Sequence, residues 1–138
     1  MDAVPVNYLA VLVSALIPMA LGFFWYGPIF GKLWAHLAGV SMDSMQKAPP
    51  TNYIIMFVGA LVMAYVLDHS LIFASTYLRI SGISAGLQAG LWSAVGFVAP
   101  ASLGVVLWEG KSWKLWAINV GYYLVALCLM GAVLGVWQ

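Results

Sequence analysis

The stretch PASLGVVLWEGKSWKLWA (residues 100–117) has a counterpart earlier in the chain, PMALGFFWYGPIFGKLWA (residues 18–35), and the two align without a gap. Each begins with a proline inside an apolar run and ends in aromatic and basic residues, as expected where a hydrophobic helix reaches a membrane boundary. The alignment predicts two related, parallel halves, about 1–78 and 79–138, within a single transmembrane domain that covers residues 1–138. The identical pairs are Pro18/Pro100, Leu21/Leu103, Gly22/Gly104, Lys32/Lys114, Leu33/Leu115, Trp34/Trp116, Ala35/Ala117 and Gly39/Gly121.

The composition indicates an integral membrane protein. Hydrophobic residues make up 64% of the 138 residues and charged residues only 7%, whereas an average soluble domain has about 25% charged residues. Five basic and four acidic side chains cannot form the polar surface of a soluble fold of this length. The net charge of +1 argues against a nucleic-acid partner, because a phosphate-binding face needs many clustered Lys or Arg residues.

The charged residues divide the chain into four long uncharged intervals. They lie between Asp2 and Lys32, between Lys47 and Asp68, between Arg79 and Glu109, and after Lys114. A spanning helix needs about 20 apolar residues, so each interval accommodates one helix. The sequence therefore predicts an all-α bundle of four transmembrane helices near residues 6–26, 52–74, 84–107 and 114–137. Pro18 and Pro100 are expected to bend the first and third of them.

The connection between the first two spans is more polar. Lys32 and His36 are four residues apart, opposite a row of apolar residues, which predicts a short interfacial helix at about 28–39 that opens at Pro28. The stretch SMDSMQKAPP (residues 41–50) is expected to be a linker, with Thr51 or Asn52 capping the next helix. The loops at this end hold four lysines against one Arg79 at the other, so we expect them to be cytoplasmic and both termini to lie outside.

The third predicted helix opens with Gly82, Gly86 and Gly90 at four-residue spacing. In lipid, helices associate largely through close contact across small residues. We expect this face to form a homo-oligomer; the alternative is that the same glycines pack against the first helix of the same chain.

The segments GFVAPASLGVVLWEGKSWKLWAINVGYYLVALCLMGAVLGVW (residues 96–137) and GFFWYGPIFGKLW (residues 22–34) resemble a known family. It comprises small bacterial membrane proteins designated domain of unknown function 1761. The resemblance implies a four-helix protein of the bacterial cytoplasmic (inner) membrane, and it brings no activity or assigned site residues.

The main function hypothesis is non-enzymatic binding or transport of a small or lipid-like ligand between the two bent helices, with membrane lipids as partners. Asn119, Tyr122 and Tyr123 form a polar stripe that either bonds Gln88, Ser93 or Ser102 on the third helix or lines a polar cavity. The candidate ligand-binding residues are Trp25, Trp108, Glu109, Asn119, Tyr122 and Tyr123. For Glu109 the alternative is a salt bridge with Lys111 or Lys114 that fixes the turn.

Asp68 and His69 are adjacent titratable groups near the end of the second predicted span. They are candidates for proton exchange, or alternatively lie among headgroups with Asp68 paired to Arg79 or another neighbour. The two His residues and the single Cys128 have no metal-ligand spacing, and no catalytic or cofactor motif is present, so no metal, cofactor or catalytic residue is predicted. The two alternative functions are a structural or partner-binding subunit and an intramembrane enzyme that acts on lipid.

Overall fold

The computed structural model describes residues 4–138 and contains four helical segments that are long and apolar enough to cross a membrane. They contain 22, 29, 26 and 24 residues, against about 20 needed for a span. The prediction of a four-span all-α bundle is confirmed. The segments are Tyr8–Ile29, Pro50–Leu78, Gly82–Leu107 and Trp113–Val136.

The first span changes its helical form before it ends. Helix α1 (Tyr8–Phe24) is capped by Asn7, whose side chain accepts a hydrogen bond from the backbone N–H of Ala10 at 3.2 Å. It continues into a π-helical turn, η1 (Trp25–Ile29), and then into the short helix α2 (Gly31–Ala38). A short helix is thus present where an interfacial one is expected, but it begins at Gly31, because Pro28 lies inside η1 and does not open it. Its position at the membrane interface stays a prediction.

The start of α2 requires a glycine. A Cβ atom on Gly31 would lie 2.5 Å from the carbonyl oxygen of Tyr26, closer than side chains approach backbone. Only a residue without a Cβ therefore lets α2 follow η1 so tightly. Lys32 and His36 are both exposed on α2, as their spacing predicts.

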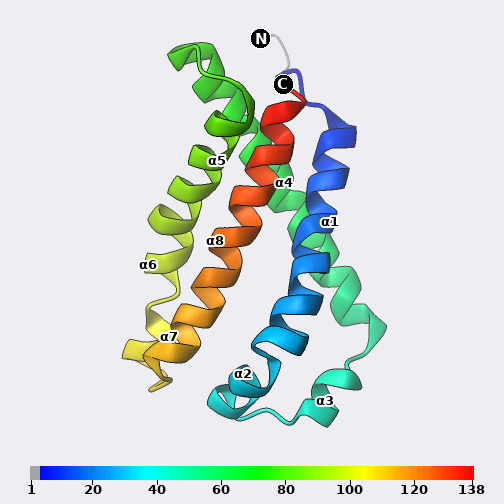
Figure 1. Ribbon diagram of the computed structural model, residues 1–138, viewed down its shortest axis with the longest axis vertical. Coiled ribbons are helices and arrows are strands. Elements are labelled where there is room, and N and C mark those ends of the chain that lie inside the picture. The colour runs from blue at the N-terminus through cyan, green and yellow to red at the C-terminus, as the bar shows by residue number, and fades with distance from the viewer. Residues whose placement is uncertain (1–3) are drawn as a thin grey trace.

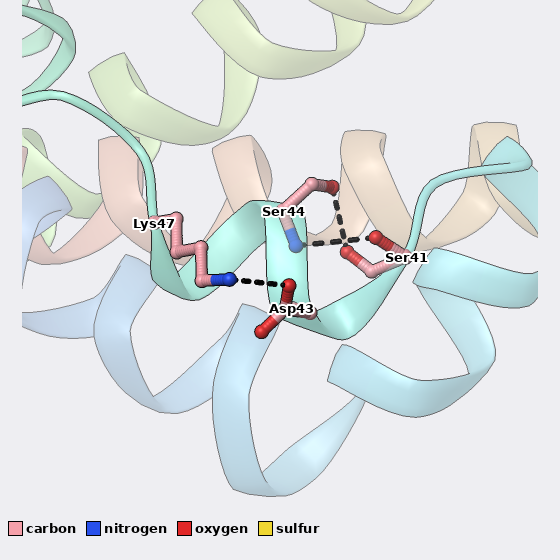
Figure 2. Close-up of polar contacts among 4 residues, drawn as sticks. All are labelled: Ser41, Asp43, Ser44 and Lys47. Carbon is pink, nitrogen blue, oxygen red and sulfur yellow. Dashed lines mark hydrogen bonds and ion pairs between the residues drawn. The ribbon is translucent and has the colours of Figure 1, made fainter.

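The expected linker contains a short helix, α3 (Met42–Gln46), which its own side chains stabilise (Figure 2). Ser41 Oγ accepts from the Ser44 N–H at 3.1 Å, and Ser44 Oγ donates to the Ser41 carbonyl at 2.8 Å. Lys47 and Asp43 form an ion pair at 2.9 Å. The prediction of a linker was wrong for residues 42–46, because Ser41 is an N-cap residue and the polar residues after it satisfy the backbone locally.

The second span is longer than expected. Helix α4 (Pro50–Leu78) begins with Pro50 in its first turn and Pro49 at the N-cap position, so neither Thr51 nor Asn52 is the cap. Proline suits the first turn because the N–H that it lacks has no helical partner there. The helix ends at Arg79, which has a left-handed backbone with φ of 52°.

The third span is interrupted. Helix α5 (Gly82–Ser93) passes into a second π-helical turn, η2 (Ala94–Val98), followed by two short helices, α6 (Ala99–Ala101) and α7 (Gly104–Leu107). Pro100 lies between η2 and the non-helical residues 102–103, so the span is interrupted on both sides of the residue where a bend is expected. A turn with Gly110 at φ of +69° leads to helix α8 (Trp113–Val136), which Ser112 caps.

Helix α8 lies at the centre of the bundle and contacts α1, α4 and α5 (Figure 1). In that view α1 and α5 flank α8, and α4 crosses behind them. Helices α1 and α4 also contact each other, and both contribute small side chains to the buried core, namely Ala10, Ala15, Ala60 and Ala64. The start of α1 and the end of α8 lie at one end of the bundle, and α2, α3 and α7 lie at the other.

The glycine stripe of α5 packs against α8 of the same chain. A Cβ atom on Gly86 would meet the carbonyl oxygen of Gly131, and one on Gly90 would meet that of Leu127. We expected this stripe to lie between copies of the chain or, alternatively, against the first helix of the same chain. In the structure Gly86 and Gly90 contact α8 instead. The homo-oligomer itself stays a prediction, and Gly86 and Gly90 are covered within the chain.

Candidate functional site

Side chains of the first half and of α8 are joined by hydrogen bonds at the end of the bundle that carries the lysines. Asn119 Oδ1 accepts from the Tyr26 hydroxyl at 2.8 Å and from Trp34 Nε1 at 3.0 Å. Trp25 Nε1 donates to the Ile118 carbonyl at 3.0 Å. These bonds fix η1 and α2 on the first turns of α8.

Tyr122 continues this contact one turn further along α8. Its hydroxyl donates to the carbonyl of Pro18 at 2.7 Å, and its ring lies 5.1 Å from that of Tyr26 between centroids. The polar stripe of α8 thus bonds to the first span. The expected partners on the third span bond elsewhere: Gln88 to Ser84, Ser93 to the Ala89 carbonyl, and Ser102 to the Ala99 carbonyl.

A cavity of about 540 Å³ lies beside these tyrosines, between α1, α3, α4 and α8. It exists because α4 stands away from the bundle at its start: residues 50–56 are all exposed, whereas Ala60 and Ala64 further along are buried. The lining residues are Pro18, Met19, Gly22, Phe23, Tyr26, Gly27, Met42, Met45, Gln46, Tyr53, Met56, Tyr122 and Tyr123.

The lining of this first cavity is aromatic and methionine-rich and contains no Asp, Glu, Lys, Arg or His residue. Helix α3 contributes Met42 and Met45 from one side, while its ion pair between Asp43 and Lys47 is exposed on the other. Methionine side chains are flexible and polarisable, so they adapt to ligands of different shape. Such a surface suits an apolar molecule.

A second cavity of about 380 Å³ lies between α4, the α5–η2 segment and α8. Its lining is apolar apart from three hydroxyl groups, and Tyr123 lines both cavities. The lining residues are Val62, Met63, Val66, Leu67, Ser70, Ser93, Phe97, Val98, Tyr123 and Leu127.

The residues predicted to bind ligand fall into three groups. Tyr122 and Tyr123 line the first cavity. Trp25 and Asn119 do not line it, and their side chains form hydrogen bonds between the first span and α8. Trp108, with 88% of its surface exposed, and Glu109, also exposed, lie near the turn between α7 and α8 and line neither cavity. Within residues 4–138 Glu109 forms no ion pair, so the expected salt bridge to Lys111 or Lys114 is absent.

Sequence reasoning missed Met42, Met45 and Met56 as lining residues. Met42 and Met45 lie three residues apart in a polar segment, which was a signal for an apolar face on a short helix. The direction of that face depends on the packing of α3, which the sequence alone does not give.

Asp68 and His69 are at the opposite end of the bundle and line neither cavity. Asp68 is 1% exposed, and its Oδ1 accepts a hydrogen bond from Gln138 Nε2 at 2.8 Å. Asp68 is therefore bonded to Gln138, which follows α8, and not to the expected partner Arg79. His69 contacts the Tyr65 carbonyl through Nδ1 at 2.9 Å, and residues 4–138 contain no cluster of three metal-ligating side chains.

The fold defines a class, an α-helical membrane protein with four apolar spans, and the first cavity in it has an uncharged lining. A family model described as "Protein of unknown function (DUF1761)" matches residues 9–135. The chain therefore belongs to this family, which confirms the resemblance noted above. No curated protein and no solved structure matches the chain.

Proposed function

We propose that this protein binds an elongated, uncharged and mainly apolar molecule from the membrane in the first cavity. The observation that carries the proposal is the lining itself, a volume of about 540 Å³ with methionine and aromatic side chains and no charged residue. Small-molecule sites commonly have volumes of about 300–1,000 Å³ and predominantly apolar walls. Membrane lipids are the natural source of such a molecule.

The absence of charge in the lining favours an uncharged ligand. A charged group moved into an apolar site loses its hydration, and this loss is very unfavourable without a partner of opposite charge. The polar groups that the lining does offer are the Gln46 amide and tyrosine hydroxyls. These groups are suited to a small neutral head that forms hydrogen bonds.

Binding is better supported than the other functions considered. A polar path for a solute is not supported by two separate, mainly apolar cavities. Catalysis lacks support because Asp68, His69 and Glu109 lie outside both linings. A structural subunit that docks through the glycine stripe is disfavoured, since Gly86 and Gly90 already contact α8.

Photolabelling of the purified protein tests the proposal. The probe is a monoacylglycerol that carries a diazirine in its acyl chain, and excess monoacylglycerol without a diazirine is the competitor. We expect saturable, competed labelling of Tyr122, which is only 4% exposed and therefore shielded from bulk lipid. A fatty acid probe of equal chain length, ionised at neutral pH, should label Tyr122 more weakly.

A matched pair of variants on α1 gives the control. Met19→Trp places a larger side chain in the cavity and should weaken probe binding about tenfold, which corresponds to about 1.4 kcal/mol. Leu16→Trp changes a residue that is 52% exposed and lines neither cavity, so it should leave binding unchanged. Unsaturable labelling confined to exposed residues, or equal effects of the two variants, would contradict the proposal.

A further inference from the structure

We propose that Tyr123 is a movable partition between the two cavities, and that the hydrocarbon chain of the bound molecule passes it to enter the second cavity. This inference rests on the function proposed above and specifies its ligand as a single-chain, uncharged amphiphile of the monoacylglycerol class. Its basis is that Tyr123 lines both cavities.

The tyrosines of this region differ in how firmly they are held. The hydroxyl of Tyr122 bonds to Pro18 and that of Tyr26 bonds to Asn119. Within residues 4–138 the hydroxyl of Tyr123 forms no hydrogen bond, and its ring makes an edge contact with Tyr122 at 5.0 Å between centroids. A side chain without a polar anchor changes rotamer more easily, so Tyr123 is the wall residue that can move.

The second cavity is suited to a hydrocarbon chain. Of its hydroxyl groups, that of Ser70 donates to the Val66 carbonyl at 3.0 Å and that of Ser93 donates to the Ala89 carbonyl at 2.7 Å. The remaining side chains apart from Tyr123 are apolar. Both serine hydroxyls already donate to a carbonyl of their own helix, so they have no donor left for a polar head group. An acyl chain needs no hydrogen bond.

The two cavities also follow each other along α4. Tyr53 lines the first cavity and Ser70 the second, a separation of about 25 Å at 1.5 Å per residue. The polar end of the ligand then lies in the first cavity near Gln46 and Tyr53, and the chain extends toward Leu67. The smaller volume of the second cavity, about 380 Å³, favours one chain rather than two.

Two monoacylglycerol probes with a diazirine at the chain end test this arrangement, one with a short chain and one with a long chain. Leu67 and Leu127 report on the second cavity because they are 3% and 5% exposed and hence shielded from bulk lipid. We expect the short probe to label Tyr122 and the long probe to label Leu67 or Leu127. This comparison uses the unaltered protein.

Substitutions of Tyr123 test the partition. Tyr123→Trp should narrow the passage, reduce labelling of Leu127 by the long probe and weaken its binding about tenfold, whereas Tyr123→Ala should increase that labelling. Tyr77→Ala is the control, because Tyr77 is 90% exposed and lines neither cavity.

The outcomes separate this inference from the proposed function. Absence of saturable labelling at Tyr122 with both probes would overturn both. Labelling of Tyr122 by both probes, with Leu67 and Leu127 unlabelled in the unaltered protein, would overturn this inference alone. So would long-probe labelling of Leu127 that is the same in Tyr123→Trp, Tyr123→Ala and Tyr77→Ala.

Discussion

Asn119 shows how one side chain joins distant parts of this chain. A single carbonyl oxygen on α8 accepts hydrogen bonds from Tyr26 in η1 and from Trp34 in α2. Both bonds are partly buried, and a buried donor left without an acceptor is unfavourable. Asn119 therefore positions the wall of the first cavity without lining it.

Replacement of Asn119 tests this role. Asn119→Leu leaves two donors without an acceptor, and we expect it to lower the free energy of unfolding by about 2 kcal/mol. Thermal unfolding in mild detergent, followed by tryptophan fluorescence, measures the change. Asn52→Leu, at an exposed position on α4, is the control and should have little effect. Unchanged stability in Asn119→Leu would contradict the assigned role.

The same residue bears on the predicted internal repeat. Trp34 and Trp116 occupy aligned positions, and the residue aligned with Asn119 is Leu37, which has no side-chain acceptor. Trp34 Nε1 bonds to Asn119, whereas Trp116 Nε1 is buried without a hydrogen-bond partner. Trp34 has an acceptor and Trp116 has none, as expected if the position of Asn119 in one half is taken by Leu37 in the other. The repeat itself stays a prediction.

Helices α5 and α8 are in close backbone contact. A Cβ atom on Gly86 would overlap with the carbonyl oxygen of Gly131, and one on Gly135 would overlap with that of Gly82. Since lipid provides little hydrophobic force between helices, this close backbone contact is the main attraction that small residues allow. The stripe therefore stabilises the fold of the single chain.

A glycine-to-alanine pair tests the contact between α5 and α8. Gly86→Ala forces the two backbones apart, so we expect a loss of about 2 kcal/mol in the free energy of unfolding. Gly59→Ala is the control, because a Cβ atom there would meet nothing within 4 Å. Thermal unfolding and native mass spectrometry of both variants give the answer. If Gly86→Ala dissociated an oligomer while each chain stayed as stable as before, the stripe would instead lie between copies.

In the whole molecule, the even number of spans places the start of α1 and the end of α8 at one end of the bundle and the lysine-bearing segments at the other (Figure 1). Lysine-rich loops are generally retained in the cytoplasm. We therefore expect α2, α3 and the α7–α8 turn to face the cytoplasm. The part of the first cavity that α3 lines would then lie at the cytoplasmic leaflet.

Cysteine accessibility measures this orientation. In a Cys128→Ala background, Ser81→Cys reports on the end with the termini and Ser44→Cys on the end with α3. A membrane-impermeant maleimide should label Ser81→Cys in intact cells and Ser44→Cys only after lysis. The reverse pattern would show the opposite orientation, and labelling of both in intact cells would contradict the four-span arrangement.

The sequence by itself determined the class of fold, the number of spans and their approximate ends, because the length of an uncharged apolar run is a local property. It also indicated the interruption of the third span around Pro100 and the exposed Lys32 and His36 of α2. These two features depend only on residues within one or two helical turns of each other.

Only the tertiary structure decided which surfaces meet. The Tyr26 and Trp34 donors lie 93 and 85 residues from Asn119 along the chain, and no periodicity within one helix identifies such a partner. The same limit applies to the glycine stripe, which α8 covers, and to Met42 and Met45, which α3 turns toward the cavity. A helix pattern gives the face that needs a neighbour, whereas the identity of that neighbour depends on how all the helices pack together.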